Sequence, residues 1–340
     1  MLLNFYKYLI FMPLVMISSM LILILDSWFS QWMIMEINLI SFIGLIMLDK
    51  QMNSSNLMNY FLIQSFNSYI FILMTMNLNY MNMNMNFLYF LLNLSLLTKM
   101  GIPPFYFWYL KIMKNLNWMN LFILMTIQKI IPMIILNNLM NLMSNNLMNF
   151  NLVTLTFMSF ICSNLGVQNL DLKILISYSS IIQMTWIIML MYLNEVMSMN
   201  YFLIYFIISL TVILIFKKFN LNNLNELNLI KFNKFSWINI FLFMSVMSLA
   251  GIPPFFGFLM KWISIQNLNL NFPFLLVLLM ILNSLISMFF YLRLLFLFFM
   301  NYNMFLKFNL LKVNFEMNLF FKLILFIWFM NILILVYEIF

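Results

Sequence analysis

The chain has 340 residues, of which 66% are hydrophobic and 7% are charged, with a net charge of +8 and a mean hydropathy of +1.03. A soluble domain has about 25% charged residues, so this composition excludes a soluble globular protein and predicts a polytopic helical membrane protein. The absence of histidine, with Cys162 as the one cysteine, excludes imidazole-ligated haem or copper, a disulfide framework and a thiolate metal site.

Long apolar stretches predict an all-α membrane fold with about eleven transmembrane helices. In chain order the predicted spans are 5–25, 28–48, 56–76, 87–114, 118–138, 147–167, 172–193, 199–219, 235–266, 274–300 and 318–338. The fourth span is interrupted at 101–104 and the ninth at 251–254, in both cases by Gly-Ile-Pro-Pro. Proline inside a helix removes a backbone donor and clashes with the preceding turn, so both spans are predicted to be discontinuous.

The lysines in the loops and near the ends of the spans fall on one side of this predicted topology. The side that holds the N-terminus contains Lys7, Lys50, Lys111, Lys114, Lys173, Lys217, Lys218, Lys231, Lys234, Lys307, Lys312 and Lys322. Arg293 lies near the same side, and the loops of the opposite side contain neither lysine nor arginine. Because cationic loops stay on the non-translocated face, the N-terminus is predicted there and the C-terminus on the opposite face. The lysines form no basic domain, so the positive charge does not indicate nucleic-acid binding.

Four charged residues are predicted inside spans: Glu36, Lys99, Lys129 and Lys261. At 1.5 Å per residue, the first three lie at a similar depth, roughly 12 to 18 Å from the translocated face. Buried charges of this kind commonly mark proton or ion paths, although an ion pair that only fixes helix packing is the alternative. Lys261 lies nearer the translocated face, where snorkelling to the surface and a functional role are both open.

These residue types suit proton transfer. Moving a carboxylate toward or away from a buried lysine changes how tightly the lysine holds its proton, so Glu36 would load or unload a lysine station. Pro132 is expected to disturb the helix after Lys129, to free the carbonyl of Gln128 and to leave room for water.

The two interruptions predict an inverted repeat. Aligning Gly101 with Gly251 also aligns Pro103 with Pro253, Pro104 with Pro254, Phe105 with Phe255 and Lys111 with Lys261. The two spans cross the membrane in opposite directions, as in inverted-topology repeats whose broken helices form transport sites. We therefore expect a single membrane domain over 1–340, with halves at about 1–138 and 147–300 and a C-terminal helix at 318–338.

Six stretches carry a family resemblance. They are SWFSQWMIMEINLISFI (27–43), LLTKMGIPPFYFW (96–108), WMNLFILMTIQKIIP (118–132), ISYSSIIQMTW (176–186), LAGIPPFFGFLMKW (249–262) and FFYLRLLF (289–296). In order and spacing they resemble the NADH dehydrogenase subunit 2 family, antiporter-like membrane subunits of the mitochondrial proton-pumping NADH–ubiquinone oxidoreductase, complex I.

The resemblance implies two inverted five-helix repeats and a part in coupling NADH:ubiquinone electron transfer to proton translocation. It assigns Glu36 and Lys99 to the family's glutamate–lysine pair, Lys129 to its central lysine and Lys261 to the lysine toward the exit side. It implies no cofactor in this chain, because FMN, iron–sulfur clusters and ubiquinone are bound by other subunits. The implied partners are other membrane-arm subunits, including neighbouring antiporter-like subunits, and lipids such as cardiolipin.

The expected location is the mitochondrial inner membrane, with the N-terminus in the matrix and the C-terminus in the intermembrane space. No cleaved targeting peptide is visible, which fits synthesis inside the organelle. The chain departs from the family at Tyr106 and Gln183, where histidine is common, and at Thr185. Tyrosine and glutamine do not titrate near neutral pH, so lysine, glutamate and water are expected to suffice. A stand-alone cation/proton antiporter and a non-conducting scaffold remain the alternatives.

Overall fold

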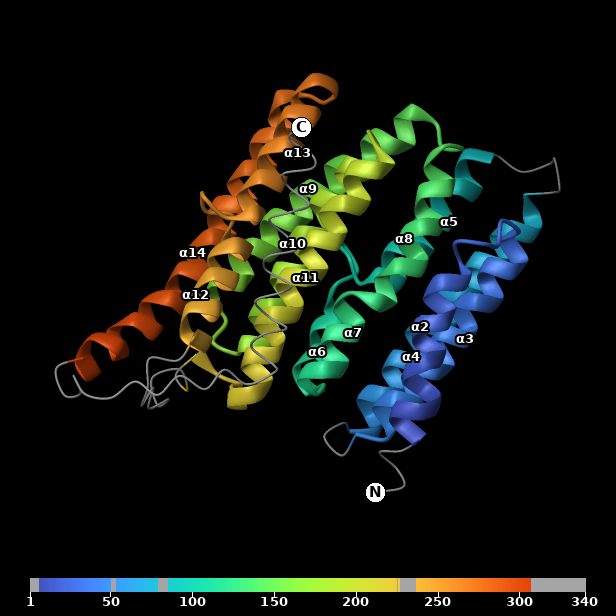
Figure 1. The fold of residues 1–340 in the computed structure, drawn as a ribbon. Coiled ribbons are helices and arrows are strands. Elements are labelled where there is room, and N and C mark those ends of the chain that lie inside the picture. Colours follow the sequence, from blue (N-terminus) through green and yellow to red (C-terminus); the bar gives the residue numbers. More distant parts are fainter. Residues whose placement is uncertain (1–5, 50–52, 79–84, 225, 227–236, 307–340) are drawn as a thin grey trace.

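The protein is a bundle of helices that run roughly side by side (Figure 1). The computed structural model describes residues 6–49, 53–78, 85–224, 226 and 237–306. The first helices are the π-helix η1 (Lys7–Phe11), α2 (Met12–Leu21), α3 (Trp28–Met47), α4 (Ser54–Asn77), α5 (Met85–Met100), α6 (Phe107–Asn115) and α7 (Trp118–Met125). They are followed by α8 (Ile127–Met140), α9 (Asn145–Gln168), α10 (Leu172–Met191), α11 (Glu195–Phe219), α12 (Trp237–Ala250), α13 (Phe256–Asn271) and α14 (Phe274–Leu306).

Seven helical stretches in the described part of the chain are long and apolar enough to cross a membrane. They are Trp28–Met47, Ser54–Asn77, Trp118–Met140, Asn145–Gln168, Leu172–Met191, Glu195–Phe219 and Phe274–Leu297. The predicted spans from 5–25 to 274–300 each coincide with one helix or with a consecutive pair of helices. The count of eleven stays a prediction, because the span 318–338 lies outside the described residues. The same holds for Lys50, Lys231, Lys234, Lys307, Lys312 and Lys322.

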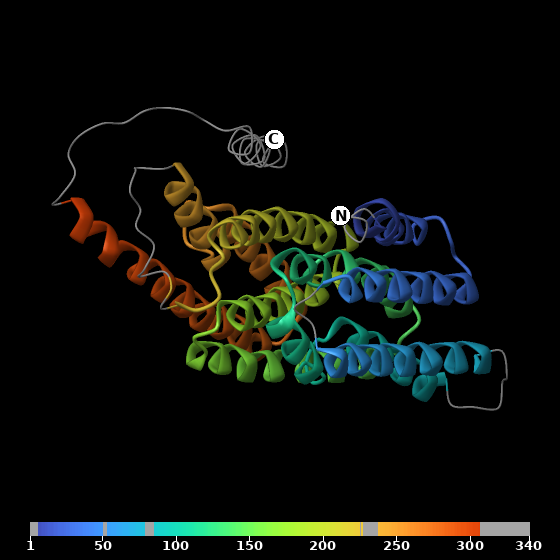
Figure 2. The same cartoon turned by 90° about the horizontal axis from the view of Figure 1, so that it is seen from below.

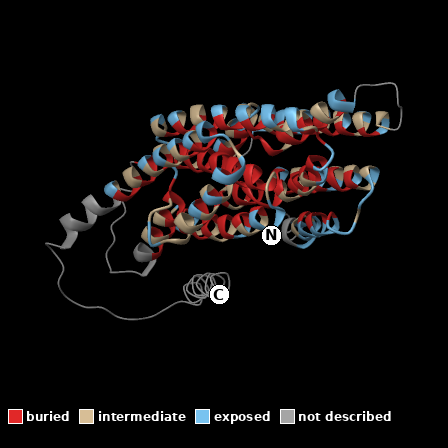
Figure 3. Ribbon diagram, turned by 90° about the horizontal axis from the view of Figure 1, so that it is seen from above, coloured by how far each residue is buried: buried red, intermediate tan, exposed pale blue. Residues whose placement is uncertain are grey.

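The burial pattern is that of a protein in lipid. On α4, Leu62, Phe66 and Leu73 are 57%, 65% and 59% exposed, whereas the polar Gln64 and Asn67 are buried. Figure 3 shows the same arrangement around the bundle, with buried residues inside and exposed faces outside. Since lipid is as apolar as a leucine side chain, an apolar exterior around polar interior groups is stable in a membrane and not in water.

The two Gly-Ile-Pro-Pro stretches separate helices with the same backbone conformation. Gly101 and Gly251 have positive φ values of 64° and 76°, and both stretches contain a cis Pro–Pro bond. The amide of Gly101 donates to Thr98 and that of Gly251 to Ser248, each at 3.1 Å. The next hydrogen bonds also correspond: Ile102 to Leu97, Phe105 to Ile102, Ile252 to Met247 and Phe255 to Ile252. The helices therefore end at equivalent places, at Met100 and Ala250.

A further interruption lies at Thr126, where α7 ends and α8 begins. Its φ and ψ of −121° and −75° are not helical, and the sequence does not predict this position. Pro132, where the sequence predicts a disturbance, does not break the helix, because α8 continues through that residue. Proline still lacks an N–H, so the Gln128 carbonyl loses its usual helical partner.

The helices pack in two groups that meet at α6 and α7. Helices α2, α3, α4, α5 and α8 pack on one another, as do α9, α10, α11, α12 and α14. Helix α6 packs against α10, and α7 packs against α10 and α11. Figure 2 shows the N-terminal helices at one end of the bundle and α14 at the other. The segments after the first break thus lie between the two groups.

Candidate functional site

Lys99 and Lys129 line one cavity inside the first group of helices. The cavity has a volume of about 30 Å³, and its walls come from α3, α4, α5, α6, α7 and α8. Its lining residues are Met35, Asn38, Leu39, Tyr60, Gln64, Lys99, Met100, Trp108, Leu124, Gln128, Lys129, Ile131 and Pro132. A polar cavity needs roughly 10–15 Å³ to accommodate a water molecule, so this one has room for water between the lysines. The shared depth predicted for these two residues agrees with this arrangement.

Lys99 lies in the last turn of α5, directly before the first break. Its Nζ is 3.4 Å from the sulfur of Met35, and its carbonyl accepts a hydrogen bond from Gln64 at 3.2 Å. A cation is favoured at the C-terminal end of a helix, where unpaired carbonyls concentrate partial negative charge. The break therefore gives this half-buried lysine a polar environment that an uninterrupted helix would lack.

Glu36 lies beside Met35 on α3 and within electrostatic range of Lys99. Its side chain is half-buried, and its Oε1 is buried without a hydrogen-bond partner among the described residues. Glu36 does not line the cavity itself. The structure thus places the acid close to Lys99 but not between the two lysines.

Asn38 and Gln128 form a reciprocal amide pair at the wall of the cavity. Asn38 donates to Gln128 at 3.1 Å, and Gln128 donates back to Asn38 Oδ1 at 3.0 Å. Sequence reasoning missed this pair of side chains and named Gln128 only for its backbone carbonyl. The available signal was the presence of two side-chain amides inside otherwise apolar spans, because each amide needs a hydrogen-bond partner in lipid.

Lys129 is 1% exposed, and its Nζ has no hydrogen-bond partner in the described part of the structure. The ammonium lies over the ring of Tyr109, 4.6 Å from the ring centroid. This contact is cation–π, since the face of an aromatic ring is electronegative. Lys129 thus faces the cavity on one side and an aromatic ring of α6 on the other.

Lys261 is separate from these two lysines and lies at the second break. It is 6% exposed, and its Nζ donates to the carbonyl of Ala250, the last residue of α12, at 3.1 Å. The snorkelling alternative for Lys261 is therefore wrong, because the side chain turns inward. Lys99 precedes the first break and belongs to the last turn of α5. Lys261 follows the second break, but its ammonium reaches back to the C-terminal end of α12.

Tyr106 and Gln183 stand where the resemblance implies histidine, and both have partners within the protein. Tyr106 stacks on Phe107 with ring centroids 4.3 Å apart, and Gln183 accepts a hydrogen bond from Tyr201 at 2.6 Å. Gln183, Tyr201 and Thr185 are buried in the second group of helices. This group thus contains polar groups that do not titrate near neutral pH.

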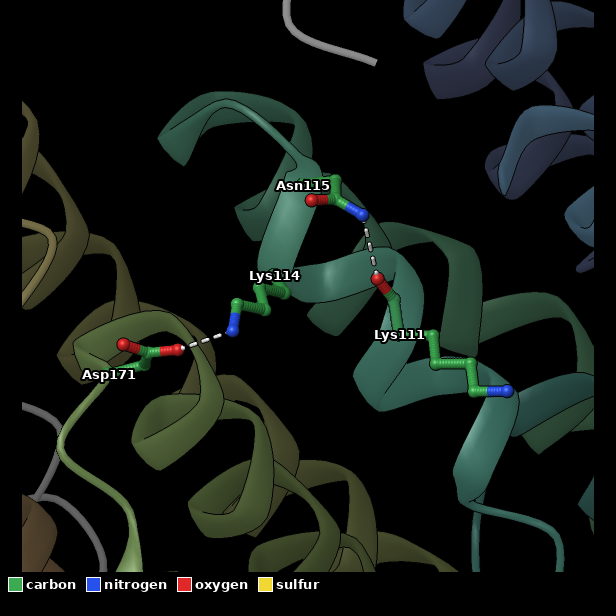
Figure 4. A network of polar contacts seen from close by, with 4 residues as sticks. All are labelled: Lys111, Lys114, Asn115 and Asp171. Atoms are coloured by element: carbon green, nitrogen blue, oxygen red, sulfur yellow. Dashed lines mark hydrogen bonds and ion pairs between the residues drawn. The ribbon is translucent and has the colours of Figure 1, made fainter. Parts of the chain in front are cut away.

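Charged residues at the end of α6 connect the two groups of helices. Lys114 forms an ion pair with Asp171 at 3.0 Å, while Lys111 points away from it (Figure 4). Arg293 donates to the carbonyls of Val167 and Asn169, at 2.6 and 2.8 Å, at the C-terminal end of α9. Asp171 and Arg293 lie on the face predicted to be cationic, so these contacts fit the predicted positions.

Comparison with known proteins identifies the family. A transmembrane family described as NADH:quinone oxidoreductase/Mrp antiporter matches residues 26–287. The chain is 39% identical over 300 residues to NADH-ubiquinone oxidoreductase chain 2 of Aedes aegypti, covering 85% of this chain and 86% of that protein. The corresponding protein of Anopheles gambiae is 34% identical over 293 residues, covering 84% and 82%.

The fold is also found in a solved structure. A chain of respiratory complex I from Thermus thermophilus superposes with a TM-score of 0.76 at 17% identity, covering 86% of this chain and 70% of that chain. At this identity the likeness concerns the fold alone. The family match and the identity to full-length relatives go further: the chain belongs to the NADH-ubiquinone oxidoreductase chain 2 family.

Proposed function

We propose that this protein is a membrane-arm subunit of respiratory complex I that transfers protons while other subunits oxidise NADH and reduce ubiquinone. The observation that carries this proposal is the cavity shared by Lys99 and Lys129 inside a membrane-spanning bundle. A half-buried and a fully buried lysine beside one polar cavity are costly in lipid and serve packing poorly, whereas they suit proton exchange. Family membership adds the assembly in which this exchange would be used.

In the proposed relay, Lys99 and Lys129 exchange a proton through water in the cavity. Two nearby ammonium groups repel each other, so protonation of one lysine favours proton release from the other. The Asn38–Gln128 pair offers both donors and acceptors at the cavity wall. Glu36 would stabilise the charged form of Lys99 when the two approach, which makes Lys99 the station that responds to movement of α3.

Lys261 is the proposed third station, on the exit side. Its ammonium is held at the end of α12, where the Ala250 carbonyl favours the charged form, so proton release there would weaken this hydrogen bond. The proposal includes eleven spans, two inverted halves with discontinuous helices, and an N-terminus on the matrix side of the mitochondrial inner membrane. It places FMN, iron–sulfur clusters and ubiquinone in other subunits, with neighbouring antiporter-like subunits and inner-membrane lipids as partners.

A stand-alone cation/proton antiporter is the second candidate, because the matching family description includes Mrp antiporters. Purification in mild detergent separates the two. The proposal expects the chain to comigrate with flavin- and iron–sulfur-containing subunits and to show no sodium transport when reconstituted alone in liposomes. Sodium/proton exchange by the isolated chain, together with migration apart from redox subunits, would contradict it.

A further inference from the structure

Tyr109 connects the central lysine to the second group of helices. We infer that Tyr109 is a positioning residue for Lys129: its ring holds the lysine's ammonium, and its hydroxyl fixes that ring to α10. The inference rests on the proposed function, since it concerns a lysine of the proposed relay. Three described contacts carry it, and they involve α6, α8 and α10.

The first contact is between the ring and the ammonium. Tyr109 is fully buried, and Lys129 Nζ lies 4.6 Å from its ring centroid. Nζ has no hydrogen-bond partner among the described residues, so the ring is the contact that they offer to its charge on the side away from the cavity. An aromatic face attracts an ammonium and offers little to a neutral amine. The ring therefore favours the charged lysine in this orientation.

The second and third contacts fix the ring in place. The hydroxyl of Tyr109 lies 2.7 Å from Oγ of Ser180, which is also fully buried. Ser180 donates its own proton to the carbonyl of Ser177 at 2.7 Å, so Tyr109 is the donor in the bond between the two hydroxyls. Successive hydrogen bonds of this kind polarise one another. A tyrosine that donates into such a chain keeps an electron-rich ring for the lysine.

The position of Tyr109 in the fold gives this arrangement a consequence. The residue lies on α6, just after the first break, whereas Lys129 belongs to α8 and Ser180 to α10. A displacement of α10 relative to α8 would pull the ring from beneath the ammonium. The contact therefore makes the charge of Lys129 sensitive to movement between the two groups of helices.

The test compares substitutions in the assembled complex in inner-membrane vesicles. Tyr109→Leu removes the ring and is expected to lower NADH-driven proton transport about tenfold. Tyr109→Phe keeps the ring and loses the hydroxyl, so a loss of about two- to threefold is expected. Phe71→Leu, a matched loss of a buried ring that packs on Trp28 away from the lysines, should stay within about twofold of the parent.

If Tyr109 served packing alone, the three variants would not rank in this order of lost proton transport. Equal transport by the Leu and Phe variants would overturn the inference, as would a loss for Phe71→Leu as large as for Tyr109→Leu. In a Lys129→Met background, Tyr109→Leu should cause no further loss; an additional tenfold loss there would also overturn it. If Tyr109→Leu does not assemble, Tyr109→Met takes its place with the same expectations. Normal transport by Lys129→Met itself would contradict the proposed function instead.

Discussion

The ammonium of Lys261 donates to the carbonyl of Ala250, and so reaches back across the second break to the end of α12. Lys99 belongs to the last turn of α5, directly before the first break, and its Nζ lies 3.4 Å from the sulfur of Met35. Each half thus has a lysine beside its break, half-buried in the first half and buried in the second. The C-terminal end of an interrupted helix offers partial negative charge where lipid offers none, which favours a lysine beside each break.

Gly251→Ala should disturb this second lysine. A Cβ there would come within 2.8 Å of Lys261 Nζ, and the φ of +76° is unfavourable for alanine. We expect a loss of stability of about 1–3 kcal/mol, read as a lower thermal midpoint of the assembled complex. Gly166→Ala is the control, because the nearest atoms to its Cβ are at 3.4 Å, an ordinary contact. Equal midpoints for the two variants would show that the close approach is unimportant.

The Asn38–Gln128 pair predicts non-additive substitutions. Replacing either residue with leucine leaves the other amide buried without its partner, at a cost of about 1–3 kcal/mol. The double substitution removes both polar groups, so its cost should be smaller than the sum of the single costs. Thermal inactivation of the four proteins measures this difference. Strict additivity would mean that the amides do not depend on each other.

Arg293→Lys should weaken the end of α9. The planar guanidinium donates to two carbonyls at once, at Val167 and Asn169, and an ammonium matches that geometry poorly. The expected loss is about 1–2 kcal/mol in the thermal stability of the complex. Lys114→Gln removes an ion pair whose lysine is 60% exposed, and should cost less than about 1 kcal/mol. A larger effect for Lys114→Gln than for Arg293→Lys would reverse this ranking.

Much of the fold follows from local sequence signals. Gly-Ile-Pro-Pro predicts helix ends at Met100 and Ala250, because proline and positive-φ glycine act within a few residues. Counting residues along each span also predicts that Lys99 and Lys129 lie at a similar level, and the structure places both at one cavity. Both properties depend on one helix at a time, which is why sequence alone suffices for them.

The rest depends on how helices are rotated against each other. The Asn38–Gln128 pair needs α3 and α8 to present particular faces, and the contact between Lys129 and Tyr109 needs α6 to lie beside α8. Neither orientation is fixed by hydropathy, since lipid-facing and buried positions are both apolar in these helices. The inward turn of Lys261 is a choice of side-chain rotamer, and the interruption lies at Thr126 and not at Pro132, the proline of the same stretch.

The most direct measurement is NADH-driven proton transport by a Lys129→Met complex in inner-membrane vesicles. The account predicts a loss of about tenfold or more in proton transport and in NADH:ubiquinone oxidation, because the substitution removes a proton station of the relay. NADH oxidation by an artificial acceptor that bypasses ubiquinone should stay normal, and so should the amount of assembled complex. Lys217→Met, a substitution of an exposed lysine at the end of α11, is the control and should leave both rates unchanged. Parental rates of proton transport in the Lys129→Met complex would contradict the account.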